Sequence, residues 1–342
     1  MSGRLSPKIF AAIGLPLTLL VAMVSLAHGP EPTTLGQTLR ALLDGLGLAT
    51  ADGNHALIVN TVRLPRIATA LLVGAALALA GTTMQAVFRN PLASPDVLGT
   101  MLGAAFGAVV AIATGFSGSF LMATPLAALA GAALTTALVY ALGAAHGTAT
   151  TTGLLLAGIA LNSLLGAAIS FITLTLAPNF TTSGEILFWL MGGLEARSTD
   201  HVLMVGLGLL VFGFALLPFA RDMDLLTLED EAATTLGVPV RVLRHVLLLL
   251  SCGLTAVAVS CTGGVAFVGL VVPHLVRLVV GPGHRGLLPA AALGGAFVLV
   301  LADTACRLAP IGVELRLGIV TSALGAPFFL LLLARHRRGR PL

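Results

Sequence analysis

Charged residues are scarce in this sequence. Asp, Glu, Lys and Arg make up 9% of its 342 residues, while 57% are hydrophobic, and an ordinary soluble domain carries about 25% charged residues. Between Asp96 and Glu185 none of the four types occurs, and His146 is the one side chain there that titrates near neutral pH. A chain of this composition cannot cover a globular surface with polar groups. The sequence therefore favours a protein that is solvated by lipid.

Lysine is almost absent, and this bears on the source of energy for any transport. Lys8 is the only lysine, so the chain contains no GxxxxGK[ST] loop to cradle nucleotide phosphates. The apolar runs also hold almost no ionisable group at mid-membrane depth, where proton- and sodium-coupled carriers usually place Asp, Glu, His or Lys. If this chain moves a substrate uphill, the energy must enter from another subunit.

Cysteine is rare and unpaired, with three residues and no CxxC motif. Cys252, Cys261 and Cys306 lie in or beside apolar runs, so we expect small buried side chains rather than zinc ligands or disulfides. His274, in VVPH, stands alone, and a hydrogen-bonded packing role is expected for it. The sequence thus predicts no metal site, no cofactor and no catalytic residue.

The apolar runs are long enough for about ten membrane-spanning helices at about 20 residues each. Each run is expected to be helical, because lipid offers no partner to an unpaired backbone group. The predicted fold class is an all-α polytopic membrane protein forming one transmembrane domain, 1–342. The expected spans are 9–28, 66–88, 95–115, 120–142, 153–176, 200–220, 243–261, 264–281, 286–305 and 316–334.

The N-terminal run admits two interpretations. Arg4 and Lys8 precede it and Ser25-Leu26-Ala27 would suit a signal peptidase, so a cleaved signal peptide stays open. The run exceeds a signal core of about 7–15 residues, and many spans follow, so we take it as the first span.

The distribution of basic residues predicts that both termini are cytoplasmic. With ten spans and both ends inside, twelve of the 18 Lys and Arg residues lie on the inner side and six on the outer, as the positive-inside rule requires. The basic tail Arg335–Arg340 accounts for most of the high pI. It is short and ends a span, so no nucleic-acid partner is expected.

Glycine is abundant, with 40 residues, and recurs at helix-packing spacing. Gly99, Gly103 and Gly107 form one small-xxx-small ridge, and Gly74 with Ala78 forms another. In lipid such ridges let helices approach closely, so tight packing rather than ligand binding is expected of them.

One sizeable cytoplasmic segment, 221–242, is expected between spans. It is acidic at first, then small and helix-favouring, and it breaks at Gly237-Val238-Pro239. This pattern indicates a short amphipathic helix on the membrane surface, where a motor subunit could attach. A solvated connector is the alternative.

An ordered set of motifs from about residue 60 to residue 335 resembles the FecCD family, the permeases of type II ABC importers for ferric siderophores, haem and cobalamin. The motifs are RLPR at 63–66, GAALALAG at 74–81, Gln85, RNPLASPDVLG at 89–99, LLLAG at 154–158, LFWLMGG at 187–193, LGV at 236–238, GGVAFVGLVVPHLVR at 263–277, HRGLLP at 284–289, AD at 302–303 and LGAPFFLLLL at 324–333.

The resemblance implies an inner (plasma) membrane subunit with no enzymatic activity of its own. Ten spans per subunit and a homodimer or close heterodimer are implied. So are two cytoplasmic ATP-binding subunits and a periplasmic substrate-binding protein.

The resemblance also implies three sets of functional residues. The docking arginines are Arg63, Arg66 and Arg307, which would receive carboxylates of the binding protein through their planar guanidinium groups; anchoring of helix ends to lipid headgroups is the alternative. The cytoplasmic gate consists of Asn90, Leu92, Thr151 and Thr152, which are otherwise ordinary turn and helix-start residues. The residues that couple to the ATPase are Glu229, Ala232, Leu236 and Gly237.

Two positions depart from the family pattern. Leu228 stands where a glycine often precedes the glutamate of the coupling segment. Arg316 replaces the proline of the Glu-Leu-Pro motif before the last span, and it adds a cation on the outer face. The second departure bears on docking or substrate entry.

Two other functions stay open. A secondary carrier or channel with the same number of spans is disfavoured by the missing intramembrane charges. A membrane scaffold that transports nothing is the other alternative. Siderophore, haem and cobalamin are not distinguished, because Gly, Ala, Thr, Ser and aliphatic residues would line a pathway for any of them.

Overall fold

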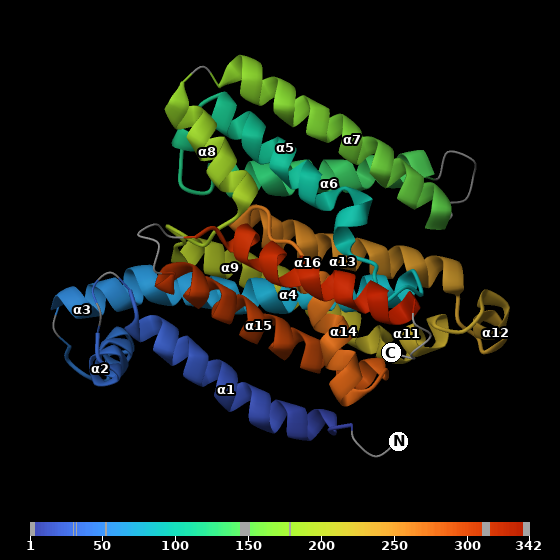
Figure 1. Cartoon of the computed structure of the whole chain (residues 1–342), viewed down its shortest axis with the longest axis horizontal. Helices are drawn as coiled ribbons and strands as arrows, with labels where there is room; N and C mark the ends of the chain where they lie inside the picture. The colour runs from blue at the N-terminus through green and yellow to red at the C-terminus, as the bar shows by residue number, and fades with distance from the viewer. Residues whose placement is uncertain are drawn as a thin grey trace.

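The computed structural model describes residues 4–29, 31, 33–51, 53–143, 151–177, 179–309 and 315–337; at Thr151 and at 332–337 it describes the backbone alone. These residues form helices and turns, without a β-strand among them, and most helices follow one long axis (Figure 1). The helical segments in the ranges expected as spans are α1 (Pro7–Ala27), α4 (Leu64–Val87), α5 (Thr100–Ala113), α6 (Ala123–Gly143), α7 (Thr151–Leu176), α9 to α11 (Thr199–Leu226), α13 (Val240–Thr262), α14 (Val268–Val280), α15 (His284–Leu308) and α16 (Leu317–Arg337).

Seven of the described helical segments are long and apolar enough to cross a membrane, and α5, α14 and Leu317–Leu331 of α16 are shorter apolar helices. The all-α polytopic fold class is therefore confirmed. Helices α5 and α14 begin later than the expected spans for local reasons. Before α5, Pro95–Leu98 forms a 3₁₀ turn and Gly99 takes a left-handed φ of 81°. Before α14, Phe267 has a φ of 66°, which interrupts a helix.

The segment from α9 to α11 is a broken helix. Between α9 (Thr199–Gly208) and α10 (Phe214–Leu216) lies a π-helical turn, and a 3₁₀ turn precedes α11 (Ala220–Leu226). A π-helical turn, Ile58–Arg63, likewise precedes α4 and joins it to α3 (Gly53–Leu57).

Two helices between the first two expected spans, α2 (Leu35–Gly45) and α3, and one short helix near the middle of the chain, α8 (Phe180–Met191), were not anticipated. Helix α2 starts at a capping box in which the Thr34 hydroxyl accepts from Gln37 N–H and the Gln37 side chain accepts from Thr34 N–H. Helix α8 begins at Asn179, whose side chain accepts from Thr182 N–H. Each is too short for a span, so its capping residues were its main sequence signal.

Helix α4 is the central helix of the bundle, and almost all of its residues are buried. It packs on α15, α13 and α14. The closest approach to α15 is at two glycines: a Cβ added to Gly74 would lie 2.2 Å from the Gly295 carbonyl oxygen, and one added to Gly295 would lie 2.1 Å from that of Gly74. The predicted packing role of the Gly74–Ala78 ridge is confirmed, because Ala78 Cβ also lies 2.6 Å from the Cβ position of Gly295.

Helices α5 to α8 form a second group on one side of this core, at the top of Figure 1. The predicted glycine ridge lies at the α5–α6 contact, where a Cβ on Gly103 would lie 2.7 Å from Gly131 O and one on Gly107 would lie 2.1 Å from Ala127 O. Cys252, Cys261 and Cys306 are buried, as predicted.

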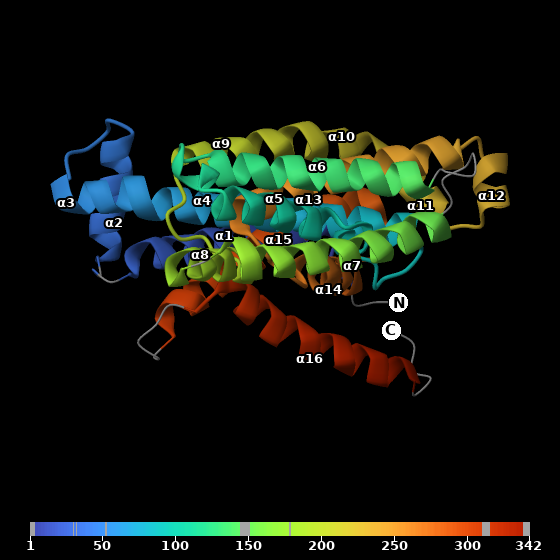
Figure 2. The same cartoon turned by 90° about the horizontal axis from the view of Figure 1, so that it is seen from above.

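The bundle has two ends that carry different features. Helix α1 begins and α16 ends at the end that carries the short helix α12 (Asp230–Thr235), called the α12 end (Figure 1). Helices α2, α3 and α8 lie at the other end, called the α8 end. From its start at the α8 end, α16 diverges from the other helices (Figure 2).

Candidate functional site

The segment predicted to couple to an ATPase contains a short helix, α12, as expected of an amphipathic surface helix. Glu229 is its N-cap and Leu236 its C-cap. Gly237 has a φ of 86°, and Gly237 N–H donates to Thr234 O while Val238 N–H donates to Ala233 O. This is the glycine-dependent helix stop known as the Schellman motif, so the conformation at Gly237 fixes where the chain leaves α12.

All four predicted coupling residues lie on the exposed side of this segment. Glu229, Ala232, Leu236 and Gly237 are exposed, whereas Ala233 and Val238 are buried against the bundle. The Leu236 side chain is 60% exposed and that of Leu228 is 43% exposed. These two leucines are exposed apolar side chains on an otherwise polar segment.

Asp230 ties α12 to two other elements. Its carboxylate accepts from Arg244 Nη1 at 2.9 Å and from Arg244 Nη2 at 2.7 Å, and it also pairs with Arg89. Arg89 Nε donates to Leu226 O at 2.6 Å, so the turn after α4 is joined to the end of α11 as well. The hydrogen bonds from Arg244, with the Arg89 guanidinium, hold the pKa of the Asp230 carboxyl below its usual range. Sequence reasoning missed this cluster because its members lie far apart in the chain.

The predicted gate residues lie on two separate segments. In the turn after α4, the Asn90 side-chain oxygen accepts from Leu92 N–H at 2.9 Å, which forms an Asx turn. Thr151 starts α7, with its side chain outside the described part, and Thr152 is exposed. The two segments belong to elements that touch, because a Cβ on Gly158 of α7 would lie 2.3 Å from Val97 O. Among the described residues, no hydrogen bond joins Thr152 to this turn.

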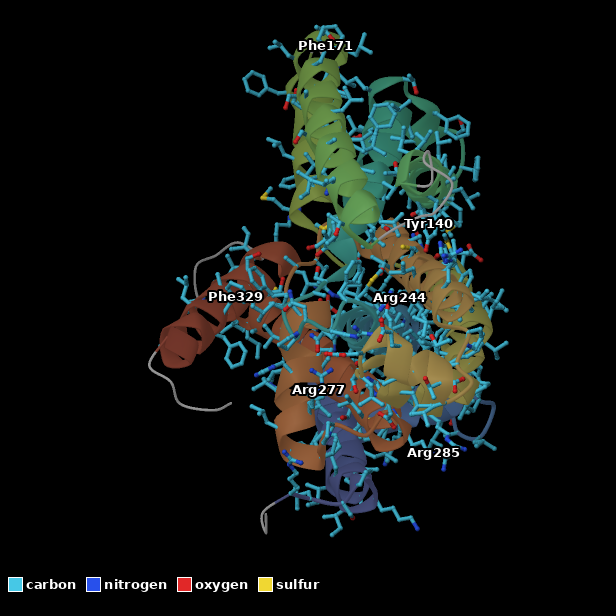
Figure 3. All side chains as sticks on the ribbon, turned by 90° about the vertical axis from the view of Figure 1, so that its right-hand side faces the viewer. Tyr140, Phe171, Arg244, Arg277, Arg285 and Phe329 are labelled. Atoms are coloured by element: carbon cyan, nitrogen blue, oxygen red, sulfur yellow. The ribbon has the colours of Figure 1, made fainter. Side chains whose placement is uncertain are left out.

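The α12 end is also rich in arginine. Figure 3 looks onto this end and shows Arg244, Arg277 and Arg285 on the core helices. These three residues belong to α13, α14 and α15, at or near the ends of those helices that lie here.

Arg63 is not the exposed docking residue that we expected. It is 5% exposed, and its Nη1 donates to Leu26 O at 2.8 Å, Ala27 O at 3.3 Å and Thr33 Oγ1 at 3.2 Å. Its Nη2 donates to Glu31 O. The last carbonyl groups of a helix lack partners within the helix, so Arg63 satisfies those at the end of α1.

Arg66 and Arg307 share one buried carboxylate. Arg66 Nη2 lies 2.7 Å and Arg66 Nε 2.9 Å from Asp303 Oδ1, and Arg307 Nε lies 3.2 Å from Asp303 Oδ2. The Asp303 side chain is 1% exposed, against 13% for Arg66 and 9% for Arg307. Arg307 Nη1 also donates to Ser25 O and His28 O. The three predicted arginines thus surround the junction of α1, α4 and α15.

Arg316, the departure from the family proline, has a defined position at the α8 end. Its Nη1 lies 2.9 Å from Glu195 Oε2, and its guanidinium carbon lies 4.0 Å from the centroid of the Phe188 ring.

His274 is 5% exposed with its ring centroid 6.3 Å from that of Phe328. Neither of its ring nitrogens has a hydrogen-bond partner among the described residues, so it packs without the hydrogen bond that we expected.

A bundle of apolar helices with an exposed surface helix at one end belongs to the class of multi-pass helical membrane proteins. The model of the FecCD transport family matches residues 17–335. The chain belongs to this family of transport permeases.

Curated relatives match nearly the whole chain. The cobalamin import system permease protein BtuC of Halobacterium salinarum is 40% identical, with 97% of each chain covered. The hemin transport system permease protein HmuU of Yersinia pestis is 38% identical, with 99% of each chain covered. The Fe(3+) dicitrate transport system permease protein FecD of Escherichia coli is 39% identical, over 84% of this chain and 88% of the relative.

A solved structure has the same fold. It is that of a metal-chelate type ABC transporter in an inward-facing conformation, and it superposes with a TM-score of 0.84 at 32% identity, covering 96% of this chain and 99% of that one.

Proposed function

We propose that this chain is the permease subunit of an ATP-driven importer that carries a ferric chelate, haem or cobalamin across the inner (plasma) membrane into the cytoplasm. The observation that carries the proposal is the exposed coupling surface on α12, where the Leu236 side chain is 60% exposed. This surface lies at the end of the bundle where α1 begins and α16 ends. The chain has one lysine and no nucleotide-phosphate loop, so ATP hydrolysis belongs to partner subunits.

The coupling surface is joined to the proposed gate by a short path of contacts. Asp230 of α12 pairs with Arg89, and Arg89 directly precedes Asn90 in the turn after α4. A displacement of α12 by an ATPase would therefore act on the turn that holds Asn90 and Leu92. Thr151 and Thr152 would close the gate from the start of α7, with the same residues of a second subunit opposite them.

Each end of the bundle would bind a different partner protein. Two ATP-binding subunits would bind the α12 ends of a permease dimer, which we take to be a homodimer. A periplasmic substrate-binding protein would dock on the α8 ends. Arg66 and Arg307 would attract its carboxylates, while Arg63 would act indirectly by fixing the end of α1 against α4. Charges of opposite sign on two partners speed their encounter.

The orientation follows from charge. With the α12 end in the cytoplasm, Arg244, Arg277 and Arg285 lie inside and the shared-carboxylate cluster of Asp303 lies outside. This distribution supports cytoplasmic termini, with docking and ATPase coupling proposed on opposite sides of the membrane.

Reconstituted uptake tests this function directly. The permease with its ATPase subunits is inserted into proteoliposomes, binding protein and labelled ferric citrate, hemin or cobalamin are added, and ATP is supplied on the ATPase side. ATP-dependent accumulation of one of them is expected, with an ionophore having no effect. Accumulation that needs an ion gradient and not ATP would establish a secondary carrier, and no accumulation of any ligand would favour a scaffold.

A further inference from the structure

A cavity of about 340 Å³ opens at the α8 end of the bundle. Helix α8, the loop after α5 and the start of α9 enclose it, together with the end of α13. Its volume lies at the lower end of the range for small-molecule sites, about 300–1,000 Å³. Among its lining residues are Phe188, Trp189, Arg197 and His201. No residue of the arginine cluster around Asp303, and none of the coupling surface on α12, lines it.

Arg197 brings a positive charge into this cavity without an adequate acceptor for it. Its Nε is buried and has no hydrogen-bond partner among the described residues. Nη2 lies 3.5 Å from Gly193 O, which is at the outer limit of a hydrogen bond. None of the ion pairs found within the described residues includes Arg197. A guanidinium carries five N–H donors and no acceptor, so most of its donor capacity is unused.

His201 directs a second donor to the same place. Ser198 N–H donates to His201 Nδ1 at 3.2 Å, so Nδ1 is an acceptor. A backbone N–H can only donate, and the proton of the ring must then be on Nε2. His201 Nε2 lies 3.4 Å from Arg197 Nη1. Both atoms are therefore donors, and their approach is not a hydrogen bond but two N–H groups that converge without an acceptor.

The neighbouring charges do not provide that acceptor. Glu195, which also lines the cavity, is paired with Arg316 at 2.9 Å. Glu185 lines the cavity too, but it is exposed and its charge is screened by water. The charge of Glu195 acts on Arg197, but within the described residues neither carboxylate forms an ion pair with it. The rings of Phe188 and Trp189 line the same cavity.

We propose that this cavity binds a carboxylate group of the transported chelate, with Arg197 and His201 as its donors. The proposal rests on the import function given above and specifies the class of substrate as a carboxylate-bearing one. A carboxylate offers two oxygens in one plane, which a guanidinium can bind bidentately while the imidazole N–H donates to one of them. The aromatic rings then contact the apolar part of the ligand. Arg316, the residue that departs from the family pattern, confines the cavity by holding Glu195.

Tryptophan fluorescence gives a direct test, because Trp189 lines the cavity and is the only tryptophan of the chain. The full chain is purified in detergent and titrated with sodium citrate at constant ionic strength. A saturable change of Trp189 emission is expected. Arg197→Gln should raise the apparent Kd at least tenfold, and Arg197→Lys, which keeps the charge and loses the fork, should give an intermediate value.

Arg40→Gln serves as the matched control, because Arg40 is an exposed arginine of α2 at the same end of the bundle. It should bind citrate as the wild type does. The carboxylate site would be overturned by an absent response, by equal affinity in all variants, or by inorganic phosphate producing the response that citrate cannot. The last result would assign the cavity to a phosphate group, such as that of a lipid headgroup.

Uptake in the reconstituted transporter separates this proposal from the import function. If the wild type imports a ligand with ATP and Arg197→Gln imports it with unchanged KM, the function stands and the substrate site is wrong. If citrate binds at Arg197 but no chelate is imported, the site stands as a carboxylate site and the import function fails. A rise of KM for a carboxylate-bearing chelate with Arg197→Gln, and not with Arg40→Gln, supports both the import function and the carboxylate site.

Discussion

Arg66 and Asp303 lie 237 positions apart in the chain and form a two-pronged ion pair, with Arg66 Nη2 and Nε 2.7 and 2.9 Å from Asp303 Oδ1. The pair joins the start of α4 to the end of α15. Arg307 also contacts the other oxygen of this carboxylate. One buried acid therefore organises two of the three arginines proposed for docking.

Replacing this acid should destabilise the protein. Asp303→Ala leaves two guanidinium groups beside a buried, uncharged position, and breaking a buried pair from one side costs about 3–5 kcal/mol. We expect a clear fall in Tm in detergent, measured by thiol-reactive dye unfolding at the buried cysteines. Asp200→Ala is the control, since Asp200 is exposed in the first turn of α9. An unchanged Tm would mean that Asp303 does not organise this junction.

Coupling to the ATPase should depend on the left-handed conformation of Gly237. Gly237→Val costs about 1–2 kcal/mol of backbone strain and shifts the exit from α12, so uptake should fall while membrane insertion and ATP hydrolysis persist. Gly283→Val is a matched control: a Cβ at either glycine meets no atom within 4 Å, and only Gly237 has a positive φ. Normal uptake with Gly237→Val would remove the coupling assignment from this segment.

The ion pairs of Asp230 with Arg89 and Arg244, called the Asp230 clamp, should transmit motion from α12 to the gate. Asp230→Asn removes the charge that holds Arg89 and Arg244, so the number of substrates imported per ATP should fall. Glu231→Gln, one position further in the same helix and exposed, should leave this ratio unchanged. An equal ratio in both variants and the wild type would show that the clamp is only structural.

The pH dependence of the Asp230 clamp follows from the direction in which the pKa of the Asp230 carboxyl is shifted. The folded-state pKa of the Asp230 carboxyl is lowered by hydrogen bonds from Arg244 and the charge of Arg89. Its contribution to stability is then complete above the ordinary Asp pKa of about 3.9 and is lost only as pH falls through the lower folded value. The number of substrates that the wild type imports per ATP should therefore stay constant from pH 6 to 8, which is roughly two units or more above the ordinary Asp pKa. A decline across this range would contradict the assignment.

The gate should be visible as contact between two subunits. Leu92→Cys or Thr151→Cys should form a disulfide across the dimer in at least one nucleotide state, since a disulfide needs Cβ atoms within about 4.5 Å. The native cysteines are buried, so they compete little for the oxidant. Leu48→Cys, 73% exposed in the loop after α2 at the opposite end, is the control that should stay monomeric on a gel. Failure of both gate variants in every nucleotide state argues against a gate here.

The sequence predicted the long helices well because each depends on a local property, an uncharged apolar run. It missed α8, which is shorter than a span and includes Glu185. It also misjudged Arg63, because the carbonyl groups that this residue satisfies lie 36 and 37 positions earlier, at the end of α1. The sequence also could not reveal that Arg197 and His201 converge as donors, since this depends on which ring nitrogen of His201 accepts from Ser198 N–H. Such features arise from side-chain orientation, which spacing in the sequence does not specify.

Docking of the binding protein should depend on Arg66 in a way that salt reveals. Arg63 is unsuitable for charge reversal because it is buried on the carbonyl groups of α1. Arg66 is the most exposed of the three, and Arg66→Gln leaves Asp303 its pair with Arg307. The association rate with the binding protein should fall several-fold at low salt, and the difference should shrink at high salt, as expected of a charge at the rim of an interface. Arg40→Gln, also at the α8 end, should change the rate less. If Arg66→Gln associates as fast as the wild type at low salt, these arginines only hold the helix ends together, and the binding protein docks elsewhere.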